Sequence, residues 1–342
     1  ELHNSSASGE AFLRRRWTKL MALNLNCVLA PVSWELLEPQ EGSFCFDMVD
    51  VLLQLARESG VKLILLWFGL WKNGRSTYVP EWVKLQQQKY ICCKNTNGEQ
   101  TSVISPFCEA AVLADARAFA ALMEYLQQHD SSQRTVLSVQ VENEAGFLGG
   151  TRDISAPAQT VHDLGIPKVL ATWLVSQGKA VQAGDHWRAA FGSNADECFM
   201  AWGFASAMDT IAKCGKRQYA LPLFVNAWTE QYPGEPAHLR PCGGPAGAGL
   251  PIWRAFAKHV DAFCPDCYQE NLAQECMPYQ IANESLLIPE MRCDRWTPAF
   301  ILYAFGELCA SGVAPFGVDA LMERAASGVQ DAVAHLTMHD PT

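Results

Sequence analysis

Short apolar segments recur along the chain and are separated by longer amphipathic ones. Seven of them, rich in aliphatic, β-branched and aromatic residues, predict strands: residues 26–34, 62–69, 135–143, 221–228, 261–269, 285–291 and 314–319. Most are apolar throughout instead of alternating, which is typical of parallel strands covered on both faces. The pattern therefore predicts a parallel sheet enclosed by helices.

Helical patterns fill the intervals between these segments. The clearest covers residues 47–60, where Asp47 is expected to cap the start of the helix and Gly60 to end it. Similar patterns cover residues 10–24, 109–129 and 295–312.

The opening residues, ELHN, would form the end of an eighth strand. Eight strand–helix units in 342 residues predict an α/β fold, a (β/α)8 TIM barrel that forms a single domain over residues 1–342. The alternative is an open doubly wound sheet, but the glycine-rich phosphate turn expected after an early strand of such a sheet is absent. Because the chain opens abruptly, we expect its natural N-terminus to lie upstream, with the first strand clipped. We expect no C-terminal β-sandwich domain within the chain.

Composition narrows the possible partners. A hydrophobic content of 49% with 18% charged residues predicts a globular protein with a large core. The net charge of −10 disfavours nucleic acid and anionic membranes as partners, and no apolar run approaches the roughly 20 residues of a membrane span. The pair Cys264 and Cys267 could suggest a redox or zinc site, but it lies in a strand-like run without a second pair. We therefore expect structural thiols there, and we expect neither metal nor organic cofactor.

Polar and aromatic residues gather where the predicted strands end. They are Trp34, Trp67, Asn143 with Glu144, Asn226 with Trp228, Tyr268, Glu290 and Asp319. In a barrel these ends share one face, which is the face that carries active sites. The stretches that follow, residues 70–105, 145–220 and 229–250, are long and in part aromatic, so they are expected to wall a pocket.

Two of these residues are carboxylates at matching positions. Counting the opening ELHN as the first strand, Glu144 ends the fourth strand and Glu290 the seventh, and these two strands face each other across the barrel mouth. Two carboxyl groups that converge on one anomeric carbon, with oxygens about 5 Å apart, can cleave a glycosidic bond. The alternative for either residue is a buried salt bridge or a carboxylate on the rim. Glu142 is expected to point into the barrel as a structural carboxylate.

Two motifs give the sequence a family resemblance. Residues 140–146 resemble Q-[IV]-E-N-E-Y-G, with Ala145 in place of the tyrosine, and residues 38–46 resemble E-P-x-x-G-x-[FY]-x-F. Residues 80–82 resemble a P-x-W element, and the opening ELHNSS resembles a first strand that carries a histidine. On these motifs the chain resembles a clan A glycoside hydrolase, specifically family 35 and its bacterial β-galactosidase-like relatives.

The resemblance implies a retaining exo-β-galactosidase. It implies that Glu144 is the general acid/base and Glu290 the nucleophile. It further implies that Asn143 bonds the sugar 2-hydroxyl and that Tyr268 holds the nucleophile in place. The substrate would be an oligosaccharide or another glycoside.

The segment after the third predicted strand departs from family 35. That family usually places there a glutamate that contacts sugar hydroxyls, and this chain has Trp71, Lys72 and Asn73 instead. We expect Trp71 to be a platform for a sugar ring, and Lys72 and Asn73 to contact hydroxyls. Further expected substrate contacts are Trp34, Asn226, Trp228 and His3, although at least one of the tryptophans is expected to lie in the core.

Other interpretations stay open at this point. The specificity could be for a β-xyloside, a β-glucoside or an α-L-arabinoside, or the chain could be a sugar-binding barrel with little turnover. The sequence does not determine the oligomeric state or the compartment, although a polysaccharide substrate favours a secreted or periplasmic protein over a cytoplasmic one.

Overall fold

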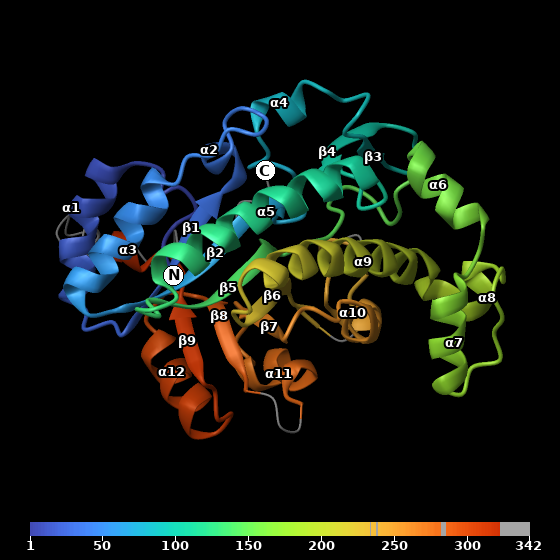
Figure 1. The fold of residues 1–342 in the computed structure, drawn as a ribbon. Coiled ribbons are helices and arrows are strands. Elements are labelled where there is room, and N and C mark those ends of the chain that lie inside the picture. Colours follow the sequence, from blue (N-terminus) through green and yellow to red (C-terminus); the bar gives the residue numbers. More distant parts are fainter. Residues whose placement is uncertain (233, 237–238, 282–284, 322–342) are drawn as a thin grey trace.

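The computed structural model describes residues 1–321 except 233, 237–238 and 282–284. Its central feature is a seven-stranded parallel sheet with the order β1-β2-β5-β6-β7-β8-β9 (Figure 1). The strands are β1 (Cys27–Ser33), β2 (Lys62–Lys72), β5 (Val136–Asn143), β6 (Leu223–Trp228), β7 (Ala262–Cys267), β8 (Leu287–Met291) and β9 (Gly312–Pro315). All seven strands predicted from the apolar segments are therefore present, and all of them run parallel.

The opening residues occupy the position between the two end strands of this sheet. The amine of Glu1 donates to the carbonyl of Pro315 at 2.9 Å, and the amide of Leu2 donates to the carbonyl of Leu29 at 3.0 Å. The amide of Gly317 donates to the carbonyl of Glu1 at 3.0 Å. The extended segment thus connects β9 to β1 at the carboxyl-terminal side and completes a single-domain (β/α)8 barrel, as predicted.

Helices surround the sheet (Figure 1). Those that follow the barrel strands are α1 (Glu10–Met21), α2 (Trp34–Leu37), α3 (Asp47–Ser59), α5 (Glu109–Asp130), α9 (Ala195–Gln218), α10 (Leu250–Phe256), α11 (Leu272–Cys276) and α12 (Thr297–Gly306). Short 3-10 turns lie at η3 (Gly247–Gly249), η4 (Met277–Tyr279) and η5 (Val318–Ala320). No helix among the described residues is both long and apolar enough to cross a membrane.

The predicted start of the third helix needs a small correction. Asp47 is the first residue of α3, and Phe46 takes the cap position without a side-chain cap. The ring of Phe46 stacks on Tyr125 of α5 at 4.0 Å between centroids, so packing between the two helices fixes where α3 begins. Gly60 ends the helix in the left-handed conformation, φ 69°, as predicted.

The two long stretches after β2 and β5 carry extra elements. The first contains α4 (Glu81–Lys84) and the hairpin β3 (Cys92–Lys94) and β4 (Gln100–Ile104). The second contains α6 (Ala156–Asp163), α7 (Lys168–Ser176), α8 (Trp187–Phe191) and η1 (Gly192–Asn194), which extend away from the barrel beyond α9 (Figure 1).

The two cysteines of the CPDC segment face opposite sides of β7. Cys264 packs in a cluster with Leu66 and Phe68 of β2 and Phe224 of β6, whereas Cys267 packs in a separate cluster with Ile288. Residues three apart on a strand point to opposite faces, so the pair cannot act as one dithiol. Both side chains are buried, as expected of structural cysteines.

Candidate active site

The carboxyl-terminal ends of the barrel strands bring the two predicted carboxylates to one buried site. Glu144 follows β5 directly and Glu290 lies near the end of β8, and their exposed fractions are 3% and 2%. The negative charge of Glu290 raises the pKa of Glu144, so the two groups lie within electrostatic reach of each other. Between these two positions in the sheet, Tyr268 directly follows β7 and Asn226 lies on β6.

The backbone turns sharply where β5 ends. Glu142 and Glu144 have φ values of 61° and 45°, in the left-handed region that residues other than glycine rarely adopt. Asn143 between them still pairs with Lys72 of β2. Backbone strain of this kind costs on the order of 1–3 kcal/mol per residue and persists only where the surroundings enforce it. Here the left-handed turn breaks the alternation of side chains along β5, so that successive side chains face different surroundings.

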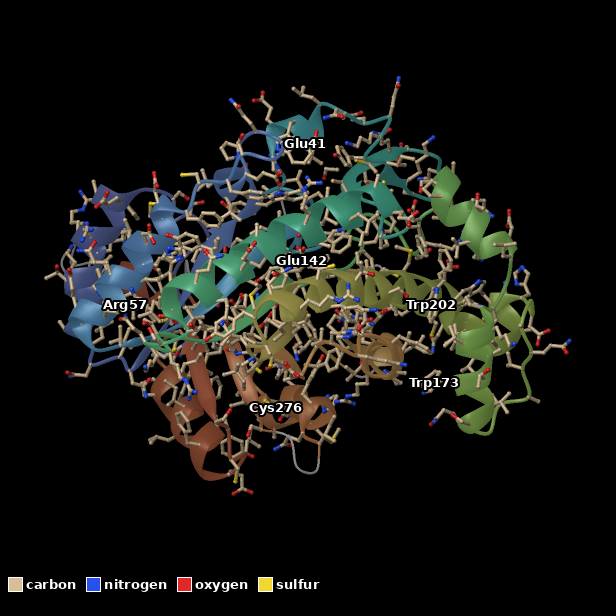
Figure 2. All side chains as sticks on the ribbon, in the orientation of Figure 1. Glu41, Arg57, Glu142, Trp173, Trp202 and Cys276 are labelled. Atoms are coloured by element: carbon tan, nitrogen blue, oxygen red, sulfur yellow. The ribbon has the colours of Figure 1, made fainter. Side chains whose placement is uncertain are left out.

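Glu142 is a structural carboxylate, but it does not point into the barrel as predicted. Its oxygens accept the backbone amides of Leu70 at 3.0 Å and Trp71 at 2.7 Å. Its carboxyl group also contacts Asp115 of α5, and Figure 2 shows Glu142 beside this helix. A Cβ atom on Gly69 would lie 2.5 Å from Oε1 of Glu142, so the carboxyl fits only because residue 69 is glycine. The prediction of its direction was wrong because the left-handed turn rotates Glu142 out of the strand pattern.

The environment of Glu144 favours the protonated acid. Burial raises its pKa to about 8, the charge of Glu290 adds to this effect, and Lys72 and a hydrogen bond with Asp266 act against it. Oε2 of Glu144 is buried and has no hydrogen-bond partner among the described residues. These surroundings therefore favour a proton on Glu144 at neutral pH.

Glu290 has a different neighbour. The hydroxyl of Tyr268 donates a short hydrogen bond to its Oε1, while Oε2 is buried without a partner among the described residues. Burial and then the charge of Glu290 raise the pKa of Tyr268 well above its ordinary value, so the phenol stays protonated and remains a donor.

A side chain that the sequence reasoning missed fixes the position of Tyr268. The carboxyl of Glu275 accepts the backbone amides of Tyr268 at 3.2 Å and Gln269 at 3.1 Å and the hydroxyl of Thr229 at 3.1 Å. Burial raises the pKa of Glu275 to about 7. It follows the strand by several residues, so no pattern at the strand end points to it.

Asn143 and Asn226 form an amide network beneath the carboxyl groups. Oδ1 of Asn226 accepts the backbone amide of Glu144 at 2.8 Å, and its Nδ2 donates to Asn143 at 3.1 Å and to Asp266 at 2.7 Å. Both amide hydrogens of Asn226 are used within the protein, so it is a positioning residue and not the substrate contact that we predicted. Nδ2 of Asn143 makes one contact, with Asn73 at 3.3 Å, and retains a second hydrogen.

Two further acids lie in the site and were not predicted. Asp266 is 2% exposed and contacts Glu144. Glu1 is 6% exposed, and its pKa is raised well above the ordinary value by burial and by Glu290, against the effect of Lys72. An acid within an apolar run was the signal that identified Glu142 and Glu144, and the same signal is present at Asp266, where the neighbouring cysteines drew attention away from it.

The expected sugar platforms Trp71 and Trp34 lie in the core. Both indoles are 0% exposed; that of Trp71 donates to the carbonyl of Ile104 at 2.9 Å and that of Trp34 to Oε2 of Glu38 at 2.7 Å. Neither ring has a free face, so this prediction was wrong for both. Oε1 of Glu38 accepts the amide of Gly42 at 2.7 Å, which shows that the motif at residues 38–46 builds a turn.

The remaining predicted substrate contacts differ in their exposure to solvent. Trp228 is half-buried and lines a small cavity together with Glu144, Thr229, Gln231, Asp266, Tyr268, Gln269 and Glu275. Lys72 is 5% exposed and acts electrostatically on both Glu1 and Glu144. Nδ1 of His3 lies 2.9 Å from Oδ1 of Asp319, and about a third of the His3 side chain is exposed.

Comparisons with known proteins agree with this geometry. The model of glycoside hydrolase family 42, described as β-galactosidase, matches residues 8–199, which is more than half of the chain. A search of the curated proteins gives no significant match.

Solved structures share the fold. The β-galactosidase from Bacillus circulans sp. alkalophilus is 14% identical with a TM-score of 0.63 over 92% of this chain and 49% of its own. The β-galactosidase from Marinomonas ef1 is 13% identical with a TM-score of 0.59 over 92% of this chain and 52% of its own. The catalytic domain of β-amylase from Paenibacillus polymyxa is 10% identical with a TM-score of 0.60 over 91% of this chain and 89% of its own. The chain thus spans about half the length of these two β-galactosidases.

Proposed function

Because this chain belongs to glycoside hydrolase family 42, a β-galactosidase family of clan A, we propose that it hydrolyses terminal β-D-galactosyl residues with retention of configuration. One observation carries the proposal. Two buried carboxyl groups lie within electrostatic reach, and one of them, Glu144, has a pKa raised to about 8 while the other, Glu290, accepts a hydrogen bond from Tyr268. The finer resemblance to family 35 receives no support from the family match, so that resemblance is kept at the level of the clan.

The first step of the proposed reaction forms a glycosyl-enzyme. An oxygen of the Glu290 carboxylate attacks the anomeric carbon, and the bond from this carbon to the glycosidic oxygen breaks. Glu144 gives its proton to the departing oxygen and becomes a carboxylate. Tyr268 supports this step because its hydroxyl fixes one oxygen of Glu290 and leaves the other available for attack.

The second step releases the sugar. Glu144, now a carboxylate, takes a proton from water while the water oxygen attacks the anomeric carbon. The ester bond to Glu290 breaks, and both carboxyl groups return to their starting states. The two inversions together retain the configuration of the sugar.

Other residues are proposed to bind the glycone. Asn143 has one amide hydrogen without a partner among the described residues, and we assign it to the sugar 2-hydroxyl, a contact that strengthens as positive charge develops on the ring. Lys72, Asn73, Trp228 and His3 are proposed to contact the glycoside from the wall and rim of the site.

One observation favours a second glycone specificity within clan A. Lys72 and Asn73 occupy the segment after β2 where family 35 places a hydroxyl-binding glutamate. A β-xyloside, a β-glucoside or an α-L-arabinoside is therefore an alternative glycone. A sugar-binding barrel with little turnover is disfavoured because both carboxyl groups are present and differ in environment.

A panel of nitrophenyl glycosides tests the proposal. Wild-type protein should release nitrophenol fastest from the β-D-galactoside, and Glu290→Gln and Glu144→Gln should each lower kcat/KM by about 10³-fold or more. Glu124→Gln, an exposed carboxyl on α5, serves as the matched control and should leave turnover unchanged. Wild-type turnover in both active-site variants would contradict the assignment, and a preference for another glycoside would establish the alternative specificity.

A further inference from the structure

Asp266 lies between the two proposed catalytic carboxyl groups. On β7 it pairs in register with Glu290 of β8, and its side chain lies against that of Glu144, which directly follows β5. Its backbone carbonyl accepts the hydroxyl of Thr229 at 3.2 Å, and its side chain is 2% exposed. The proposed mechanism uses Glu144 and Glu290 and assigns nothing to this third acid.

The hydrogen bonds around Asp266 require a proton. Its Oδ2 accepts Nδ2 of Asn226 at 2.7 Å, while its Oδ1 and Oε2 of Glu144 are both buried and have no donor among the described residues. Ionised carboxylates only accept, so two of them in contact cannot form a hydrogen bond unless one keeps its proton. A buried acceptor without a donor costs about 1–3 kcal/mol. While Glu144 holds its own proton it can supply this donor, but once that proton has gone to the leaving group only a proton on Asp266 leaves a donor between the two groups.

The charges around Asp266 favour its neutral form. Glu290, Glu144 and Glu1 face it from β8, β5 and the opening segment, and the phenols of Tyr268 and Tyr279 lie on the adjoining turns. The cation on this side, Lys72 of β2, acts on Glu1 and Glu144. Burial and then the charges of Glu290 and Glu144 raise the pKa of Asp266 well above its ordinary value. Ionising it would add a further negative charge beside three other buried carboxyl groups.

We infer that Asp266 is a permanently neutral carboxylic acid that donates a hydrogen bond to Glu144 and so positions the acid/base through both steps. This inference rests on the role proposed for Glu144. When Glu144 has given its proton to the leaving group, the neutral donor stabilises the carboxylate that remains. The proton of Asp266 stays on Asp266 throughout, so the residue takes no part in proton transfer to the substrate.

Two substitutions separate this role from a charged or purely structural one. Asp266→Asn keeps the geometry of a neutral acid, because Oδ1 can accept from Asn226 and Nδ2 can donate to Glu144. Its pH profile of kcat/KM should match that of wild type, with a change of about twofold or less. Asp266→Ala removes the donor, which should lower kcat about 10–100-fold and move the basic limb to higher pH, because the Glu144 carboxylate loses stabilisation.

The opposite pattern would overturn the inference. If Asp266 is ionised, Asp266→Asn removes a negative charge and moves the basic limb to lower pH, by about one unit or more. Equal losses in the Asn and Ala variants would also contradict a donor role. Thermal unfolding of each variant shows whether it is folded.

An infrared measurement keeps this test independent of glycosidase activity. The wild-type minus Asp266→Asn difference spectrum at pH 7 should contain the carbonyl band of a protonated carboxylic acid, and the band should shift when aspartate carries ¹³C in its carboxyl group. A difference spectrum with only carboxylate bands overturns the inference. If the wild type cleaves no glycoside, the proposed function fails, yet this band still decides the protonation state of Asp266.

Discussion

The hydroxyl of Tyr268 donates a hydrogen bond to Oε1 of Glu290. The two residues lie on neighbouring strands, and Glu275 holds the backbone of Tyr268 through its amide. Because the phenol keeps its proton, it fixes the orientation of the Glu290 carboxyl and leaves Oε2 available. This hydrogen bond explains how the rim of the barrel can hold one carboxyl group in the orientation that a nucleophile needs.

Removing that hydroxyl should slow the reaction without unfolding the protein. We expect Tyr268→Phe to lower kcat about 10–100-fold, since a hydrogen bond to a charged group contributes about 1.5–3 kcal/mol. Steady-state kinetics on the preferred nitrophenyl glycoside measures the effect. Tyr303→Phe, on the exposed side of α12, is the control and should be neutral. An unchanged kcat in Tyr268→Phe would show that the contact has no role in turnover.

The pH dependence of activity should report Glu144. The proposed acid must be protonated in the free enzyme, and its pKa is about 8. We therefore expect kcat/KM to hold through neutral pH and to fall above about pH 8. A basic limb that begins below pH 6 would contradict the environment described for Glu144.

Glu142 should matter for stability and not directly for chemistry. Glu142→Ala leaves the amide of Trp71 without its acceptor and leaves that of Leu70 only its longer bond to Asp115, which should lower the free energy of unfolding by about 2–4 kcal/mol. Urea denaturation measures the loss. Glu124→Ala on the exposed face of α5 should change it by less than about 0.5 kcal/mol. A loss for Glu142→Ala no larger than for this control would mean that its hydrogen bonds contribute nothing net.

Stability should decrease as pH rises from about 5 to 8. The pKa of Glu142 is raised well above its ordinary value by burial and by Asp115, and that of Glu275 is raised to about 7 by burial. In this window the folded protein therefore binds more protons than the unfolded chain, so the free energy of unfolding falls with pH. The urea midpoint measured at pH 5.5 should exceed that at pH 8. A midpoint that increases with pH would contradict the buried, protonated state of these acids.

The sequence predicted the architecture well because the barrel depends on local patterns. Continuous apolar runs predicted every strand of the seven-stranded sheet, though not the hairpin of β3 and β4, and acids at the ends of two of these runs identified Glu144 and Glu290. The burial of Trp71 could not be predicted in this way, since it depends on Phe204 of α9 and on the carbonyl of Ile104, which are distant in sequence. The direction of Glu142 depends on a left-handed backbone that no residue type signals.

The motifs predicted the class of enzyme, a clan A glycoside hydrolase, but not the family within that clan. The asparagine–glutamate pair within residues 140–146 is the feature that indicated a clan A enzyme. The motifs favoured family 35, whereas the family match assigns family 42. Asp266 also lies within an apolar run, but the sequence does not show which residues surround it. Its meaning depends on Glu144 and Glu290, which only the folded barrel brings to it.

The central claim is that Glu290 forms a covalent bond with the sugar while Glu144 supplies the proton. A 2-deoxy-2-fluoro-β-galactoside with a good leaving group tests it directly, because the fluorine slows release of the glycosyl-enzyme more than its formation. Mass spectrometry of the peptic digest should find one fluorosugar attached to Glu290, and none in Glu290→Gln. A label on another residue, or hydrolysis with inverted configuration and no label, would contradict the account.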